Sequence, residues 1–333
     1  MKLSVLEQST LSEGASAEDA INSTLTLAKA LDAMGYARLW LSEHHNMPVL
    51  QGSAPEVLLS AIGAHTQRLR IGSGGVMLPN HSAYHVAEIF RMLEALYPGR
   101  VDCGIGRASG GDAYSRSLLA PVSGRGVGFE EQVEQLDRFF HDECKRALAM
   151  PAVRTAPPLW LLSAGSGPQS GRLAAEKGMG LAIALFINPE ADEAAVTEYR
   201  RNFVPSAEMP EPRVILAVNF VCASTPEKLA EVRKTSDYFR LMRDSGRYPR
   251  MLPSHDTLSA IDFEPRQRAY LDQISNREVV GLPHEVRHQI LARAERYQAD
   301  EVMLASMSHA LADKIEAFQL VAEAFELPSL ALV

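Results

Sequence analysis

The sequence predicts an α/β protein in which eight parallel strands close into a (β/α)8 barrel. Short apolar or β-branched runs alternate with longer helical patterns, eight such pairs can be counted, and no Pro/Gly-rich linker divides the chain. Parallel strands need crossover connections, and eight crossover units in one continuous run are typical of a closed barrel. A doubly wound open sheet is the alternative fold, because the same alternation also serves it.

The composition favours a cytoplasmic protein. The 333 residues can bury a large core, and 46% hydrophobic with 22% charged residues is ordinary for a globular protein. A net charge of −8 argues against nucleic acid or an anionic membrane as the main partner. No run reaches the ~18 apolar residues of a membrane span, and no cleavable signal segment is recognised. Three widely spaced cysteines, Cys103, Cys144 and Cys222, indicate a reducing compartment.

The whole chain, residues 1–333, is interpreted as one barrel domain. Eight strands are expected at 3–6, 37–41, 69–73, 101–105, 159–162, 181–187, 214–222 and 301–305. Helices are expected at 17–34, 55–65, 82–96, 129–140 and 169–177, from near 189, from near 226, and at 311–325. Ser16 and Asp19 resemble a capping box at the start of the first helix, which Gly35 ends. The polar segment 245–281 is an expected insertion between units seven and eight.

Three glycines follow the third strand within four residues, at Gly72, Gly74 and Gly75. A glycine inside a strand pattern usually marks a bulge or a place where another group approaches the backbone closely. Three together predict a flat, bulky ligand lying against main chain that carries no Cβ atoms. A plain loop is the alternative.

Four neighbouring strands end in polar or Gly-rich segments. In a barrel of this kind the active site lies where strands end and βα loops begin. The second strand ends in 43–46, the third in the glycines, the fourth in 104–107 and the fifth in 163–170. We therefore expect the functional site at these four ends.

The turn 163–170 has the features of an anion site. Its small residues precede a helix, so free backbone N–H groups and the positive end of the helix dipole face outward. Ser166 and Ser170 add hydroxyl donors, and Arg107 on the adjacent strand supplies a bidentate cation. A phosphate or carboxylate site is the favoured interpretation. The alternative is that Arg107 pairs with a surface carboxylate and that Ser166 only caps the helix.

Two adjacent histidines, His44 and His45, end the second strand. Strand alternation sends one toward the barrel mouth and the other toward the helices. A histidine at the mouth can act as a general acid or base near neutral pH, so both are candidate catalytic residues. His81 and His85 have the spacing of a helical zinc pair. However, Ser82 stands where a metalloprotease needs Glu, and no third ligand is evident, so no metal is expected.

Several of these segments resemble the bacterial luciferase-like flavin monooxygenases over nearly the whole chain. The similar segments are the strand-two, strand-three and strand-four signatures and the entry into strand eight, at 39–48, 72–81, 98–107 and 280–304. The resemblance implies a barrel that binds FMN, usually reduced FMN from a separate flavin reductase. Reduced FMN then reacts with O2 to give a C4a-hydroperoxide, which oxidises a small organic substrate, for which an aldehyde is one candidate.

Residue roles follow from the resemblance alone. His44 matches a histidine at the reactive edge of the flavin, and Gly74–Gly75 matches a cis peptide against which the ring packs. The phosphate contacts implied are Arg107, Ser166, Gly167 and Ser170. The family also tends to form homodimers through the second and third helices.

Alternatives to this function remain open. A deazaflavin (F420)-dependent oxidoreductase on the same fold is the first, and a non-catalytic flavin-binding subunit is the second. The segment 108–128 departs from the family pattern, so the sequence does not identify the substrate.

Overall fold

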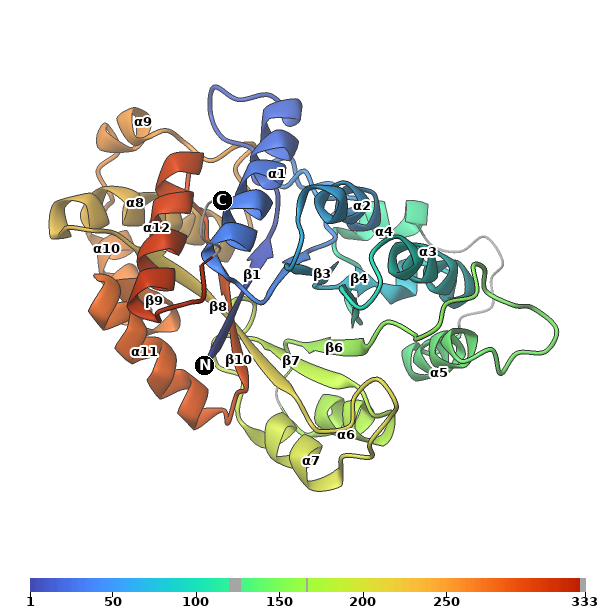
Figure 1. The fold of residues 1–333 in the computed structure, drawn as a ribbon. Helices are drawn as coiled ribbons and strands as arrows, with labels where there is room; N and C mark the ends of the chain where they lie inside the picture. Colours follow the sequence, from blue (N-terminus) through green and yellow to red (C-terminus); the bar gives the residue numbers. More distant parts are fainter. Residues whose placement is uncertain (120–126, 166, 330–333) are drawn as a thin grey trace.

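The computed structural model describes residues 1–119, 127–165 and 167–329. In this part of the chain eight parallel strands form a closed barrel (Figure 1). Their order around the barrel follows the chain: β1 (Lys2–Glu7), β2 (Arg38–Leu41), β3 (Arg70–Ser73), β5 (Val101–Gly106), β6 (Leu159–Ser163), β7 (Gly180–Ala184), β8 (Val214–Cys222) and β10 (Glu301–Ala305). Strand β10 pairs with both β1 and β8, which closes the ring. The (β/α)8 prediction is confirmed, and an open doubly wound sheet is excluded.

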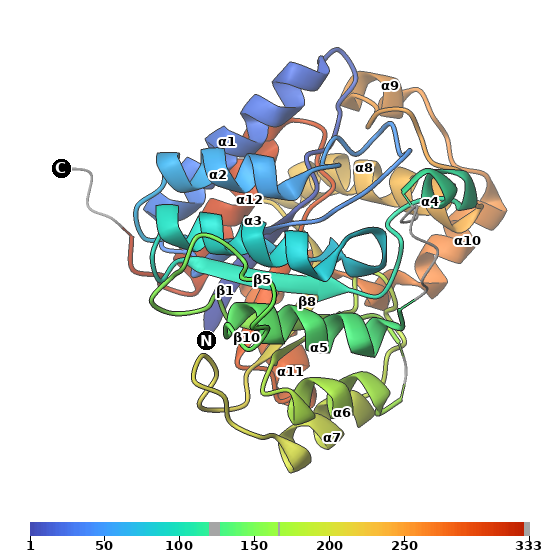
Figure 2. The same ribbon diagram turned by 90° about the vertical axis from the view of Figure 1, so that its right-hand side faces the viewer.

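Helices form the outer layer around the strands (Figures 1 and 2). The main helices are α1 (Ala17–Met34), α2 (Pro55–His65), α3 (Ala83–Leu96), α5 (Phe129–Phe140), α6 (Gln169–Glu176), α7 (Ala194–Asn202), α8 (Pro226–Asp244), α11 (Pro283–Arg296) and α12 (Leu311–Ala324). The expected capping box of Ser16 and Asp19 begins α1, and Gly35 ends it with a left-handed φ of 86°. None of the helices described is both long and apolar enough to cross a membrane.

The structure differs from the expected elements in the second half of the chain. Strand β7 ends at Ala184, and the backbone turns over 185–193 before α7 begins, whereas a longer strand and an earlier helix were expected. The cause is local, since the side chain of Asp192 accepts the N–H of Ala194 and the carbonyl of Asn188 accepts that of Ala191. These turns compete with an earlier helix start.

Additional elements lie at the βα connections. Strand β4 (Val76–Met77) continues the direction of β3 and pairs with β5, and the 3-10 turn Leu78–Asn80 follows it. The segment 108–128 contains α4 (Ala113–Leu119), and its residues 120–126 lie outside the part described. The expected insertion contains further elements: α9 (His255–Ser259), α10 (Pro265–Gln273) and β9 (Val279–Gly281).

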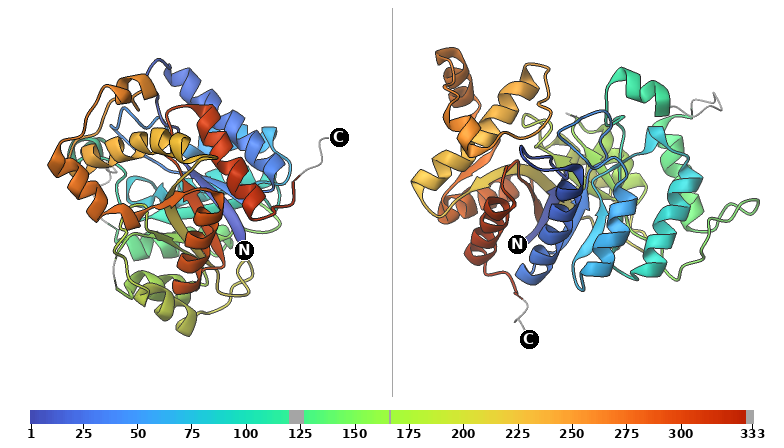
Figure 3. Two further views of the ribbon diagram at one scale, coloured as in Figure 1. Left: turned by 90° about the vertical axis from the view of Figure 1, so that its left-hand side faces the viewer. Right: turned by 90° about the horizontal axis from the view of Figure 1, so that it is seen from above.

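The barrel has two distinct ends. In Figure 2 the arrow of β5 points toward the end that carries α4 and α10, and the N-terminus lies toward the opposite end (Figures 2 and 3). Inside the barrel, the rings of Trp40 and Trp160 meet edge to face with centroids 5.6 Å apart. Leu6, Ile215 and Met303 belong to the same buried cluster. This packed interior separates the two ends.

Candidate active site

The end of β2 places the buried carboxylate of Glu43 in a hydrogen-bond cluster. Its Oε1 accepts from Nε2 of His45 at 2.7 Å and from Nε2 of His81 at 2.9 Å. Its Oε2 accepts the backbone N–H of Met77 at 2.8 Å, and Asn80 Nδ2 lies 3.4 Å from Oε1. Burial raises the pKa of Glu43, but the bonds from His81 and His45 outweigh this and hold the pKa below its usual value. A negative charge therefore ties β2 to the segment that follows β4.

His44 faces a different neighbour. Its Nε2 lies 3.1 Å from Nε2 of Gln8, which directly follows β1. An amide NH2 group only donates, so in this orientation Nε2 of His44 is the acceptor and its Nδ1 carries the proton. Burial lowers the pKa of His44 to about 4, against smaller opposing effects of the Gly110 carbonyl and Glu43. His44 is therefore a neutral imidazole at pH 7, held by β1.

The two adjacent histidines, which lie beyond the end of β2, contact different parts of the fold. His44 meets Gln8, whereas His45 reaches back to Glu43, and its backbone N–H donates to the carbonyl of Gly110. The imidazole of His45 is already engaged by a carboxylate, while Nδ1 of His44 has no hydrogen-bond partner among the described residues. Nδ1 of His45 also makes no hydrogen bond to a described residue, so the two candidates differ in that the ring of His45 is held by a carboxylate and the ring of His44 by an amide.

The peptide between Gly74 and Gly75 is cis, as the resemblance implied. A Cβ built on Gly74 would lie 2.8 Å from Leu6 and 2.9 Å from Trp40, and one on Gly75 would lie 2.9 Å from the backbone of Ile105. Close packing inside the protein therefore requires both glycines. The reason inferred from the sequence, a ligand against bare backbone, is incomplete, because neighbouring strands already exclude side chains here.

The predicted anion site lies on two adjacent strands. Gly106 of β5 aligns with Leu162 of β6, so Arg107 and Ser163 leave the barrel at the same level. The Arg107 side chain is 62% exposed, with its Nη2 3.8 Å from Glu130 Oε1. Ser163 Oγ donates to Ser170 Oγ at 2.7 Å in the first turn of α6.

Two further predicted residues belong to this turn. Gly167 has a left-handed φ of 94°, and its N–H points toward Asp192 at 3.4 Å. Ser166 lies outside the described residues. The contact of Arg107 with a carboxylate is long and exposed, so its guanidinium stays available to an anion.

Sequence reasoning missed three contributors at this end of the barrel. Gln8 contacts the predicted His44, and Asn80 and His81 contact Glu43 beside it, yet none of the three was selected for a site. Gln8 follows the first strand, so the strand-end rule would have found it had that strand been included. His81 was considered only as a zinc partner of His85, whose side chain is 67% exposed and points toward Glu88. Among the described residues, no group of three or more His, Cys, Asp or Glu side chains is arranged to hold a metal ion.

Comparison with known proteins identifies the family of this chain. Residues 1–300 match the family described as luciferase-like monooxygenase. The chain belongs to the luciferase-like monooxygenase family. A Bacillus subtilis (strain 168) relative, uncharacterized protein YwcH, is 40% identical over 98% of this chain and 99% of its own length. Another relative from that organism, N-acetyl-S-alkylcysteine monooxygenase, is 31% identical over 97% of this chain and 98% of its own length.

Solved structures share the barrel of this luciferase-like monooxygenase. Apo-MsnO8 superposes with a TM-score of 0.90 at 36% identity, covering 99% of this chain and 98% of that one. The oxygenating constituent of 3,6-diketocamphane monooxygenase, in complex with FMN, has a TM-score of 0.71 at 16% identity, covering 99% and 100%. An F420-dependent secondary alcohol dehydrogenase has a TM-score of 0.66 at 14% identity, covering 97% and 98%. These last two show the shared fold.

Proposed function

We propose that this protein is an FMN-dependent monooxygenase that uses reduced FMN and O2 to oxidise a small organic substrate. One observation carries the proposal. The four consecutive strands β2, β3, β5 and β6 end, in order, in a neutral imidazole, a glycine pair, an exposed guanidinium and a serine-rich helix start. This order provides contacts for a planar ring at one side and for its phosphate at the other.

The residues have separable roles in this proposal. Arg107, with the hydroxyls of Ser163 and Ser170 and the N-terminal amides of α6, would hold the phosphate. His44, which keeps a neutral ring through burial, would offer its Nδ1 proton to the reacting edge. Bound reduced FMN supplies the electrons that activate O2. The Glu43 cluster would keep the segment after β4 in register with β2.

The phosphate contact has a direct test. We expect Arg107→Ala to weaken FMN binding about 10- to 100-fold and riboflavin binding little, because only FMN carries the charge that a charge-assisted hydrogen bond recognises. Arg266→Ala, which removes an exposed arginine on α10, is the matched control. An equal loss for both flavins in Arg107→Ala would contradict the assignment.

Two alternatives use the same strand ends. F420 also carries a phosphate, and an F420-dependent enzyme shares the fold. Oxidised F420 with an alcohol, or reduced F420 with a ketone, would give turnover without O2 consumption, whereas the monooxygenase consumes O2 together with reduced FMN and forms an oxygenated product. A non-catalytic flavin-binding subunit would bind FMN and give no product with any substrate. An absorption spectrum of the ligand retained by the purified protein, followed by product analysis together with O2 uptake in the presence of a flavin reductase, separates the three.

The substrate class is proposed from chemistry shared with a relative. The Bacillus subtilis relative is named for N-acetyl-S-alkylcysteine, a thioether. A thioether panel and an aldehyde panel, each assayed with reduced FMN and O2, are the two arms of the substrate test. Product oxygen derived from ¹⁸O2 would support oxygenation, and peroxide release alone throughout both panels would count against it.

A homodimer is proposed from the outer face of α2 and α3. Val57, Met92 and Leu96 are exposed by 70%, 52% and 53%, respectively. Next to them is a groove of about 410 Å³ lined largely by apolar residues, with Met150 at its edge. Exposed apolar patches of this kind mark association surfaces. A second copy of the chain is the partner expected on this face from the family resemblance.

The cytoplasmic location remains a prediction.

A further inference from the structure

A cavity of about 940 Å³ opens at the amino-terminal ends of the strands, opposite the candidate active site. It is lined by the first residues of several strands and by the connections that precede them, with Lys2, Arg38, Arg70, Asp102, Val214 and Glu301 marking the strand starts. The volume is at the upper end of the range for small-molecule sites. None of the residues assigned to FMN lines it.

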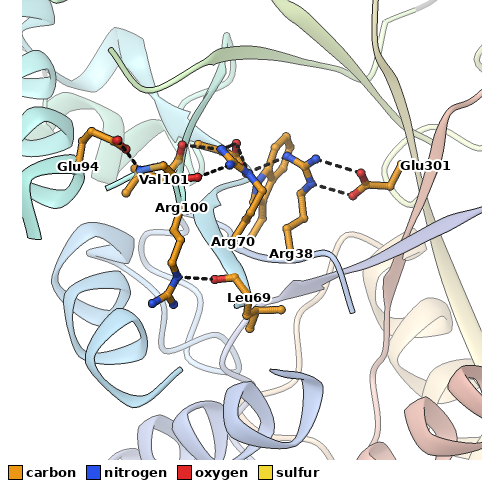
Figure 4. A network of polar contacts seen from close by, with 10 residues as sticks. Arg38, Leu69, Arg70, Glu94, Arg100, Val101 and Glu301 are labelled. Carbon is orange, nitrogen blue, oxygen red and sulfur yellow. Dashed lines mark hydrogen bonds and ion pairs between the residues drawn. The ribbon is translucent and has the colours of Figure 1, made fainter. Parts of the chain in front are cut away.

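The inner wall of the cavity is an ion network without net charge (Figure 4). Arg38 donates to Glu301 at 2.7 and 3.0 Å and to Asp102 at 2.8 Å. Arg70 donates to the other oxygen of Asp102 at 2.6 Å. Two cations and two carboxylates therefore neutralise one another, so this wall leaves no charge for a ligand.

The lining of the cavity carries five cations and five carboxylates, and the imbalance at its rim comes from how they pair. Arg213 pairs with Glu211 at 3.3 Å. Two of the lining acids are paired with cations outside the cavity, Glu208 with His141 at 3.2 Å and Asp300 with Arg200 at 2.9 Å. Lys2 and Arg154 form no ion pair with any described residue.

One carboxylate on the wall lacks a cationic partner. Glu94 accepts the N–H of Gly99 through Oε1, and its Oε2 is buried with no hydrogen-bond partner in the described part of the chain. Burial raises the pKa of Glu94. In a chain with a net charge of −8, the cationic rim is a local exception.

The remaining wall is largely apolar, with Thr155 and Arg213 as its polar members, and is built by two long connections. Residues 141–158 before β6 and 203–213 before β8 contribute Val153, Ala156 and Met209, and Ile215 of β8 lies beside them. Most αβ connections in such folds span only a few residues, and longer ones are usually functional. Trp160 also lines the wall, and its Nε1 has no hydrogen-bond partner among the described residues.

We propose that this cavity binds a small organic anion, distinct from the flavin, whose charged group pairs with Lys2 and Arg154 and whose apolar body packs against Ala156 and Met209. Cationic groups without a protein partner at the rim of an apolar cavity are the arrangement that recognises a carboxylate, sulfonate or phosphate on an apolar body. The packed barrel interior lies between this site and the candidate active site.

The test uses the fluorescence of the protein itself. The chain has two tryptophans: Trp160 lines the cavity, and Trp40 packs against the ring of Trp160. The probe is 1-anilinonaphthalene-8-sulfonate, and its matched neutral partner is N-phenyl-1-naphthylamine, which lacks the sulfonate. We expect saturable energy transfer from tryptophan to the sulfonated probe. The double variant Lys2→Ala/Arg154→Ala should weaken its binding about tenfold or more and leave the neutral probe unchanged.

Two further variants locate the probe. Ala207 is exposed and lines the cavity, so Ala207→Phe should reduce binding of both probes without disturbing the core. Arg107→Ala, at the other end of the barrel, should leave the sulfonated probe unaffected. Unchanged binding in both the double variant and Ala207→Phe would overturn the proposal. Loss of binding in Arg107→Ala would also overturn it, because the probe would then occupy the candidate active site.

Discussion

Nε2 of His81 lies 2.9 Å from Oε1 of Glu43, a carboxylate that is almost completely buried. The hydrogen bond that His81 donates to Glu43 raises the pKa of His81, against the opposing effect of burial, and the same contact helps to hold the pKa of Glu43 below its usual value. Both shifts favour the ion pair, so the contact is strongest when His81 is protonated and Glu43 is ionised.

Replacement of Glu43 by Gln should destabilise the protein by about 1–3 kcal/mol, because two imidazoles and the N–H of Met77 lose a charged acceptor. The raised pKa of His81 contributes stability below its unfolded value of 6.5, which is lost as pH rises through the folded pKa. The lowered pKa of Glu43 contributes stability above 4.5, which is lost as pH falls through the folded pKa. Urea unfolding should therefore show the largest difference between pH 4.5 and 6.5.

The histidine titration supplies the control for this prediction. In ¹H–¹³C spectra the ring signal of His81 should titrate above pH 6.5 in the original protein and at lower pH in Glu43→Gln. An unaltered titration of His81 in Glu43→Gln would show that the contact does not exist in solution.

His44 should act as a neutral group across the working pH range. With a pKa of about 4, His44 stays uncharged from pH 5 to 8. Titration of His44 should therefore cause no change near pH 6.5 in the fraction of consumed O2 that appears in the product. His44→Ala should lower product formed per O2 consumed several-fold and leave FMN affinity within about twofold, because the phosphate contacts are untouched. Product analysis with O2 uptake measures the first, and flavin titration the second.

Gln8 gives His44 its matched positioning variant. Gln8→Leu keeps the volume but removes the amide that holds Nε2 of His44 at 3.1 Å. We expect a smaller loss of coupling than in His44→Ala, with FMN affinity again preserved. Full coupling in both variants would remove His44 from its proposed role.

The barrel was predictable because the alternation of strand and helix patterns is repeated eight times along the chain. Each site residue, in contrast, depends on the position of one loop in space. Strand ends could be read locally, so Arg107 and the turn 163–170 were expected after neighbouring strands, and β5 and β6 do pair. The central position of Glu43 could not be predicted in this way, because it depends on how β4 and the residues after it fold back onto the end of β2.

Other parts were hidden for different physical reasons. The requirement for glycine at Gly74 comes from Trp40 and Leu6, residues far from it in sequence. The cavity at the amino-terminal end is formed by connections whose composition shows no periodicity, and strand-end reasoning directed attention to the opposite end. The turns over 185–193 depend on side-chain bonds such as that of Asp192 to the N–H of Ala194, which pattern reading does not detect.

Association through the α2–α3 face should be removable by a single charge. Met92→Asp or Leu96→Asp places a carboxylate in the exposed apolar patch, so a dimer should become a monomer at micromolar concentration. Size-exclusion chromatography with light scattering measures the mass. Val204→Asp, at a comparably exposed apolar residue elsewhere, should not change it. A monomer before any substitution would contradict the homodimer, and a dimer after substitution would place the interface elsewhere.

The buried network at the amino-terminal end should contribute to stability only as a complete unit. Asp102→Asn should destabilise the protein by about 3–5 kcal/mol, because Arg38 and Arg70 would face each other with one carboxylate fewer between them. Arg268 and Asp262 form an ion pair at the surface, so Asp262→Asn should cost less than about 1 kcal/mol. Urea unfolding at pH 7 compares the two. If both substitutions lower the free energy of unfolding equally, water reaches the network and screens its charges. The charges on the inner wall of the cavity would then not neutralise one another as fully as the contacts of Arg38 indicate.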